Sequence, residues 1–147
     1  MRLIHKTGTM KKTILLLLPL LLTTACSHTK IIERPEIALN SSTNYLSLER
    51  VVCTPEATRL VCCIPGKGFS IEKEAYLQSR ESGLKYVLTG AEGIEPGKKI
   101  KTDSTGLVDI SLLFEPIPTD EKQIDFIESE DWQLFGIDLS KKKKPVQ

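Results

Sequence analysis

Histidine is nearly absent from this chain of 147 residues, which contains only His5 and His28. The rest of the chain can therefore form neither a Ser-His-Asp triad nor a Cys-His pair, because both need an imidazole base. No stretch has the Cys/His spacing of a zinc site either. We therefore expect no catalytic residues of these kinds, no bound cofactor and no metal.

Long hydrophobic runs are also missing. The apolar run Ile14–Leu22 has nine residues, far fewer than the roughly 20 that a helix needs to cross a bilayer. It follows a basic segment without acids and precedes small residues and Cys26. This order is typical of a secretion signal. We predict that residues 1–25 are a signal peptide, whether translation begins at Met1 or at Met10.

The sequence Leu-Leu-Thr-Thr-Ala-Cys ending at Cys26 resembles the lipobox of bacterial lipoproteins. Ala25 stands directly before the cysteine as that pattern requires, while Thr23 replaces the usual leucine. The resemblance implies that Cys26 is the lipidation site and the first residue of the mature protein. The several acyl chains attached there would give stable membrane anchoring. Ser27 after the lipidated cysteine favours the outer membrane, and the absence of an acidic run after Cys26 favours the side facing the periplasm. An ordinary signal peptide that leaves Cys26 free is the alternative.

Removal of the signal leaves 122 residues, about the size of one domain. These carry 16 Lys and Arg against 19 Asp and Glu, a net charge of −3. A nucleic-acid-binding domain needs a basic face, so we expect no nucleic acid partner. Lys141–Lys144 begin a segment, 141–147, that we predict to be a basic disordered tail.

Three cysteines remain downstream of Cys26, namely Cys53, Cys62 and Cys63. Their number is odd and no Cys-x-x-Cys is present, so a thioredoxin-type redox pair is excluded. We favour small core residues over one internal disulfide, and both interpretations stay open at this point.

The segment 26–44 has the composition of a tether. It is rich in Ser, Thr, Asn and charges, with apolar islands only at Ile31-Ile32 and Ile37–Leu39. A flexible coil of this length reaches on the order of 20–25 Å. We predict that it holds residues 45–140, the folded domain, clear of the lipid surface.

Alternation of apolar and polar residues predicts strands within 45–140. In Leu107–Phe114, the even-numbered positions Val108 to Phe114 share one apolar face. Other expected strands are Tyr45–Cys53, Thr58–Ile64, Tyr86–Thr89, Ile124–Ile127 and Trp132–Leu139, the first two forming a hairpin through Thr54–Ala57. Ile71–Arg80 reads as either helix or strand. We predict an all-β, immunoglobulin-like antiparallel β-sandwich of about seven or eight short strands.

Five ordered blocks carry a family resemblance. They are Glu74–Gln78, Leu84–Ile94, Leu113–Pro118, Phe126–Glu128 and Trp132–Leu139. Together they resemble a small β-sandwich module of lipoproteins and secreted proteins from Gram-negative gut anaerobes, often found before a thioredoxin-like or hydrolase domain.

The resemblance implies structural roles for several of these residues. Ala75–Gln78 becomes a strand, and Gly90 and Gly93 bracket a turn with positive φ. Pro116 and Pro118 end the strand through Phe114. Trp132 and Phe135 become core aromatics. The module itself implies no activity.

Carboxylates are the remaining candidate catalytic groups. They cluster at Glu72, Glu74, Glu92, Glu95, Glu128, Glu130 and Asp131. Two of them could meet in a cleft as in a glycosidase, but acids grouped in turns are usually solvated. We predict a non-catalytic, membrane-anchored module that binds an envelope protein, since open sheet edges accept partner strands. The alternatives are a vestigial or split module of a larger enzyme, and a carboxylate-dependent hydrolase.

Overall fold

The computed structural model describes residues 28–42, 46–65, 68–100 and 106–140, which form nine β-strands. The strands are β1 (Lys30–Glu33), β2 (Ile37–Asn40), β3 (Ser47–Cys53), β4 (Thr58–Pro65), β5 (Tyr76–Ser79), β6 (Lys85–Glu92), β7 (Leu107–Phe114), β8 (Gln123–Ile127) and β9 (Gln133–Asp138). Within these ranges, no helix has the length and hydrophobicity needed to cross a membrane.

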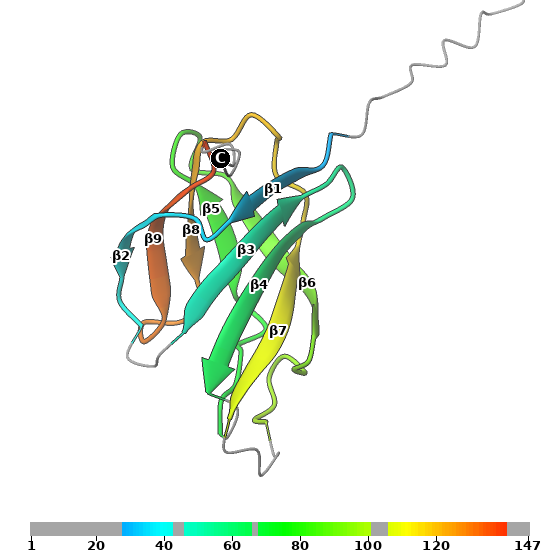
Figure 1. The fold of residues 1–147 in the computed structure, drawn as a ribbon, viewed down its shortest axis with the longest axis vertical. Coiled ribbons are helices and arrows are strands. Elements are labelled where there is room, and N and C mark those ends of the chain that lie inside the picture. The colour runs from blue at the N-terminus through cyan, green and yellow to red at the C-terminus, as the bar shows by residue number, and fades with distance from the viewer. Residues whose placement is uncertain (1–27, 43–45, 66–67, 101–105, 141–147) are drawn as a thin grey trace, which may run out of the picture.

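All nine strands belong to one antiparallel sheet, in the order β1-β3-β4-β7-β6-β5-β8-β9-β2. The sheet is strongly curled into a half-barrel: in Figure 1, β3 and β4 lie in front of β5, and β8, β9 and β2 follow to their left. The all-β prediction is confirmed. The predicted two-sheet sandwich of seven or eight strands is wrong, because one continuous sheet of nine strands wraps around the core.

Strand β6 is the reason that the sheet does not divide into two. Its first residues pair with β5, from Lys85 opposite Gln78 to Val87 opposite Tyr76. From Leu88 onward the same strand pairs with β7, with a register shift between Leu88 and Gly90. A bulge of this kind bends a strand and increases its twist. One strand therefore belongs to both halves, which an alternation pattern cannot reveal.

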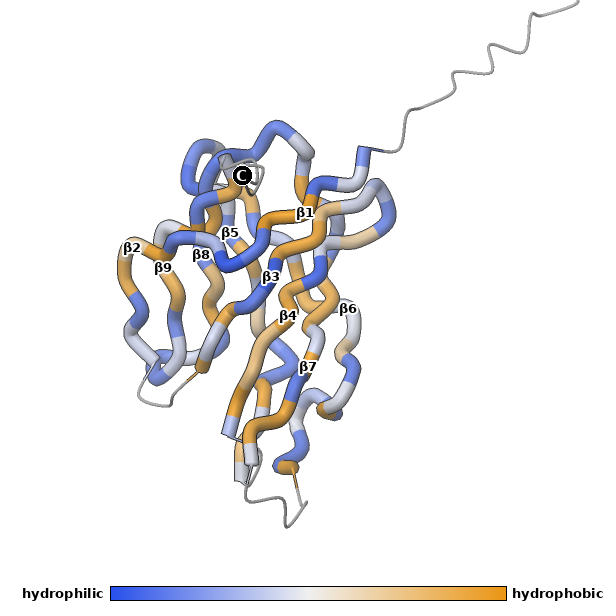
Figure 2. The backbone as a smooth tube through the Cα atoms, in the orientation of Figure 1, coloured by the Kyte–Doolittle hydropathy of each residue, from blue (hydrophilic) through white to orange (hydrophobic). Residues whose placement is uncertain are grey.

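The core lies inside the curl and follows the predicted alternation in β4 and β7. Leu60, Cys62 and Ile64 are buried, and so are Ile110, Leu112 and Phe114. The rings of Phe114 and Phe126, from β7 and β8, meet edge to face with centroids 6.0 Å apart. The two halves of the sheet are thus joined by apolar and aromatic contacts. Figure 2 shows the corresponding hydrophobic stretches along β4 and β7.

The predicted hairpin of β3 and β4 is confirmed. The helical alternative for Ile71–Arg80 is wrong, because Tyr76–Ser79 is strand β5, as the family resemblance implied. Its backbone pairs with β6 on one side and β8 on the other, and Leu77 is fully buried. Pairing on both sides outweighs a local helix preference that is worth only fractions of a kcal/mol per residue, on the order of 0.5.

The flexible tether predicted for 26–44 is wrong over its described part. The two apolar islands are the strands β1 and β2, which pair with β3 and β9. Ile32 is 3% exposed and belongs to the core, and Ile37 packs against it. The fold therefore begins near Lys30 and not at the predicted boundary of 45.

The side of β9 that faces the core changes along the strand. Ile137 and Leu139 are buried as predicted, but Phe135 is only half-buried, whereas Leu134 is buried. The pairing of β8 with β9 shifts between Ile124 and Phe126. This bulge moves Phe135 off the core side, so its assignment as a core aromatic is wrong.

Positive φ is found at Gly93, at +80°, as predicted. A Cβ there would lie 2.9 Å from the carbonyl oxygen of Asp109, so glycine is required twice over. Gly90 is not among the residues with positive φ, and it lies inside β6 after the register shift. The prediction for Gly90 is therefore wrong. Strand β7 ends at Phe114, before Pro116 and Pro118, as predicted.

Candidate functional site

An open sheet has two edges, and here they are β1 and β2. These strands follow each other in sequence, so the short link Arg34–Glu36 carries the chain from one edge to the other. Arg34 has a positive φ of 45°, an uncommon conformation for a residue with a side chain. Its N–H donates to the Glu49 carbonyl at 2.8 Å, where β3 has its own register shift. The link is thereby fixed to β3.

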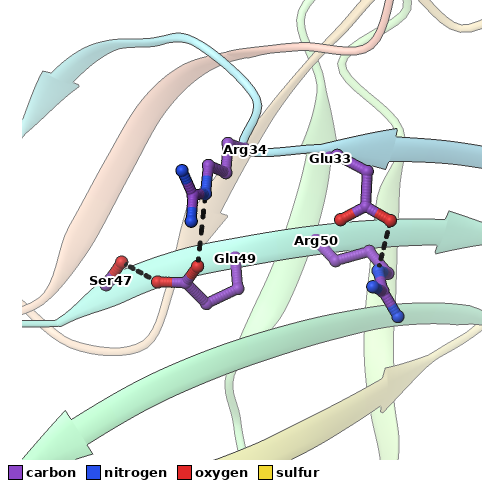
Figure 3. A network of polar contacts seen from close by, with 5 residues as sticks. All are labelled: Glu33, Arg34, Ser47, Glu49 and Arg50. Atoms are coloured by element: carbon purple, nitrogen blue, oxygen red, sulfur yellow. Dashed lines mark hydrogen bonds and ion pairs between the residues drawn. The ribbon is translucent and has the colours of Figure 1, made fainter. Parts of the chain in front are cut away.

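The β1 edge is surrounded by ion pairs (Figure 3). Arg50 lies 2.8 Å from Glu33, and the Arg34 guanidinium lies 3.8 Å from the Glu49 carboxylate. Ser47 donates a further hydrogen bond to Glu49. Charged side chains on an edge strand are a common means of preventing unwanted pairing with another chain. We therefore regard β1 as the protected edge.

The β1 edge is also held at its N-terminal end. The Lys30 ammonium donates to the carbonyl oxygens of Thr119 and Glu121, each at 3.2 Å. These contacts join β1 to the segment before β8. Lys30 is thus a further charged residue of the protected edge, besides Glu33 and Arg34.

The β2 edge, Ile37–Asn40, carries no charged residue. Leu39 is 57% exposed, one of the most exposed large apolar side chains of the described residues. Figure 2 shows β2 with a hydrophobic stretch at the outer edge of the sheet. An exposed apolar edge strand is the kind that pairs with another chain.

The backbone of β2 faces outward at Ile37. The Asp138 N–H donates to the Glu36 carbonyl at 2.9 Å, so Glu36 faces β9. Because the facing side alternates along an antiparallel strand, the amide and carbonyl groups of Ile37 point away from β9. The Ser41 N–H also donates to β9, to the Gln133 carbonyl at 3.0 Å, so the alternation is interrupted and Leu39 faces β9 with its backbone. The β2 edge therefore offers the backbone groups of Ile37 and the exposed side chain of Leu39.

A second candidate site is a pocket of about 260 Å³ at the end of the sheet where β8 turns into β9. Phe69 and Trp132 form its apolar floor, with ring centroids 5.0 Å apart, and Trp132 also stacks edge to face on Phe126. Trp132 is only 5% exposed, which confirms it as a core aromatic. Three of the predicted carboxylates, Glu72, Glu128 and Asp131, lie on the rim.

Glu128 has a structural task in this pocket. Its two carboxylate oxygens accept from the Glu72 N–H at 2.8 Å and from the Ser129 hydroxyl at 2.6 Å. The structure thus brings together Glu72 and Glu128, which belong to separate groups of carboxylates in the sequence. It also commits both oxygens of Glu128 to holding the loops around them. Across the described ranges, no group of three His, Cys, Asp or Glu could hold a metal ion.

Two of the three described cysteines are core residues, as predicted. Cys53 and Cys62 are buried, Cys63 is half-buried, and none of the three forms a disulfide. Burial raises the pKa of Cys53 to about 11 and that of Cys62 to about 12. The pKa of Cys63 is also raised, by desolvation and then by its hydrogen bond with Asp109. These thiols are protonated at neutral pH, which makes them poor nucleophiles.

The predicted lipidation site Cys26 and the signal 1–25 lie outside the described residues, and so does the predicted tail 141–147. The edge residues Ile37 and Leu39 were not singled out from the sequence. Their only signal was the apolar island within a polar segment.

Comparison with known proteins gives no match, whether the chain is compared with family models, curated proteins or solved structures. The resemblance to the module of lipoproteins and secreted proteins therefore stays a prediction.

Proposed function

We propose that the chain is a lipid-anchored envelope protein whose non-catalytic β domain binds protein by strand addition at the β2 edge. In this proposal, the lipid on Cys26 keeps the domain at the outer membrane, facing the periplasm. The family resemblance described above forms part of the same proposal.

The observation that carries the proposal is the difference between the two sheet edges. β1 is surrounded by Lys30, Glu33 and Arg34, whereas Ile37–Asn40 of β2 has no charge and exposes Leu39. Main-chain hydrogen bonds would supply affinity, and alternate side chains would supply specificity. Leu39 lies on the outermost strand, where a partner side chain could cover it.

The experiment compares two matched substitutions in a pull-down from envelope extract. Ile31 on β1 and Leu39 on β2 are exposed to similar extents, 51% and 57%. Leu39→Lys places a charge on the binding edge and should abolish capture, while Ile31→Lys should leave it unchanged. Equal capture by the two variants and the parent chain would count against strand addition at β2.

The lipid anchor has its own test. Labelled palmitate should enter the full chain in cells, and Cys26→Ala should abolish the labelling. Label retained in the alanine variant would rule out Cys26 as the attachment point.

A further inference from the structure

We infer that the domain stands on the membrane with one defined end of its sheet, and that Lys141–Lys144 bind the anionic headgroups of the lipids there. The inference rests on the proposed function, because it takes the lipid on Cys26 as given. It adds which end of the fold meets the lipid surface, and the headgroup chemistry that this end requires.

The lipid attachment point is close to the fold. Strand β1 begins at Lys30, and only three residues separate Lys30 from Cys26. A chain advances by at most about 3.3–3.6 Å per residue, so Lys30 lies within about 14 Å of the lipidated residue. The lipid surface is therefore next to the start of β1, whatever path the residues between them take.

The register of the sheet shows what else lies at this end. Lys30 is opposite Cys53 of β3, and the hairpin from Cys53 to Thr58 joins β3 to β4. Thr58 is in turn opposite Phe114, the last residue of β7. The turn Thr54–Ala57 and the segment 115–122 therefore lie at the same end as the start of β1, which is the upper end in Figure 1. We call this the anchor end.

The chain also leaves the sheet at the anchor end. The Leu139 N–H, just after β9, donates to the Lys122 carbonyl at 2.8 Å. Lys122 follows Glu121, whose carbonyl accepts from the Lys30 ammonium at 3.2 Å. The first strand and the residue after the last strand thus contact two consecutive residues. Lys141–Lys144 begin two residues after Leu139, so the four lysines are attached beside the lipid anchor.

The folded part of the anchor end is not itself basic. It includes the exposed acids Glu56, Glu115 and Asp120, which more than balance Lys30 and Lys122. The described surface alone would therefore not attract an anionic bilayer, and Lys141–Lys144 add the four positive charges that reverse the sign. Each lysine near such a surface strengthens binding about fivefold. A basic cluster beside a lipid anchor is a recognised second signal for stable attachment.

A second pair of exposed lysines provides a control at the opposite end. Lys98 and Lys99 precede Ile100, whose carbonyl accepts from the Gly68 N–H at 3.2 Å, just past the last residue of β4. Because β4 runs through Thr58–Pro65, the two ends of the sheet are about 20–25 Å apart. Charges that far from a surface are screened in physiological salt, where the Debye length is about 8 Å.

The first test uses the mature chain with Cys26→Ser, which removes the lipid and leaves the electrostatic contribution alone. Co-sedimentation compares vesicles of phosphatidylcholine and phosphatidylglycerol with vesicles of phosphatidylcholine only. Binding to the anionic vesicles should weaken at about 0.5 M salt, and by about 25-fold in Lys141→Gln/Lys142→Gln. The matched variant Lys98→Gln/Lys99→Gln should bind as the parent chain does. Equal binding by the two double variants overturns the role of Lys141–Lys144.

The second test examines the lipidated full chain in intact envelopes. A photo-crosslinking amino acid in place of Glu56 or Asp120 should label phospholipid, and one in place of Lys99 should not. Replacing Lys141–Lys144 with glutamine should weaken the labelling while palmitate incorporation persists. Palmitate incorporation without cross-links at positions 56 and 120 overturns this inference and leaves the lipid anchor intact. Absence of palmitate from the parent chain overturns the anchor itself.

Discussion

At the scale of single residues, the three described cysteines differ in how far the fold suppresses their chemistry. Cys53 and Cys62 point into the core from β3 and β4, while the neighbouring Cys63 points to the outer face. Because successive side chains of a strand point to opposite faces, the adjacent Cys62 and Cys63 cannot both face the core. The pKa shifts follow from it, since burial disfavours the charged thiolate.

We therefore predict ordered labelling of the native protein by iodoacetamide at pH 8. Cys63 should react first, although slowly because its pKa is raised. Cys53 and Cys62, with pKa values of about 11 and about 12, should react only on unfolding. Peptide mass spectrometry distinguishes the sites. Equal labelling of Cys62 and Cys63 in the folded state would contradict the assigned faces.

At the scale of elements, the sequence predicted the strands whose alternation is long and regular. β4 and β7 each have eight residues with one apolar face, so their local pattern suffices. Two features did not follow from the sequence, namely the short edge strands and the bulge in β9. β1 and β2 have four residues each, and their pairing partners lie elsewhere in the chain. A strand that short becomes recognisable only through its partner.

The bulge in β9 could not be predicted from the sequence for a different reason. Gly136 has a φ of +66°, and its N–H donates to the Asp125 carboxylate at 2.7 Å. The same carboxylate oxygen accepts from the Arg80 guanidinium at 2.8 Å. This network spans β8 and β9 and the end of β5, so no local pattern reveals that Phe135 leaves the core side.

The bulge yields a prediction about Gly136→Ala, with Gly83→Ala as its matched control. Both glycines have positive φ, but a Cβ at Gly136 would lie 2.8 Å from the Ala38 Cβ, while nothing lies within 4 Å at Gly83. Each variant carries the backbone strain of about 1 kcal/mol. Gly136→Ala must also displace β2, for a total of about 2–3 kcal/mol. Urea unfolding measures the difference, and equal losses would argue against close β2–β9 packing.

At the scale of the whole molecule, the curled sheet depends on its first two strands. β1 and β2 cover the outer sides of β3 and β9, and Ile32 joins the core. The domain boundary was predicted at 45 because the polar composition of residues 26–44 is typical of a tether. The single-sheet architecture could not be predicted either, since it depends on β6 pairing with both halves.

This architecture predicts the outcome of two truncations. A chain beginning at residue 28 should retain the stability of the mature protein. A chain beginning at 45 loses both edge strands and the buried Ile32, and should lose at least about 3 kcal/mol or fail to fold cooperatively. Thermal and urea unfolding compare the two. Equal stability would restore the tether interpretation of residues 28–44.

The proposed function places protein binding at the β2 edge. Amide hydrogen exchange at Ile37 tests it most directly, because the N–H group of Ile37 points away from β9. In the dilute soluble domain this amide should exchange quickly. In the membrane-anchored protein it should be protected, and Leu39→Lys should restore fast exchange. Fast exchange of the Ile37 amide in the anchored parent protein would contradict the account.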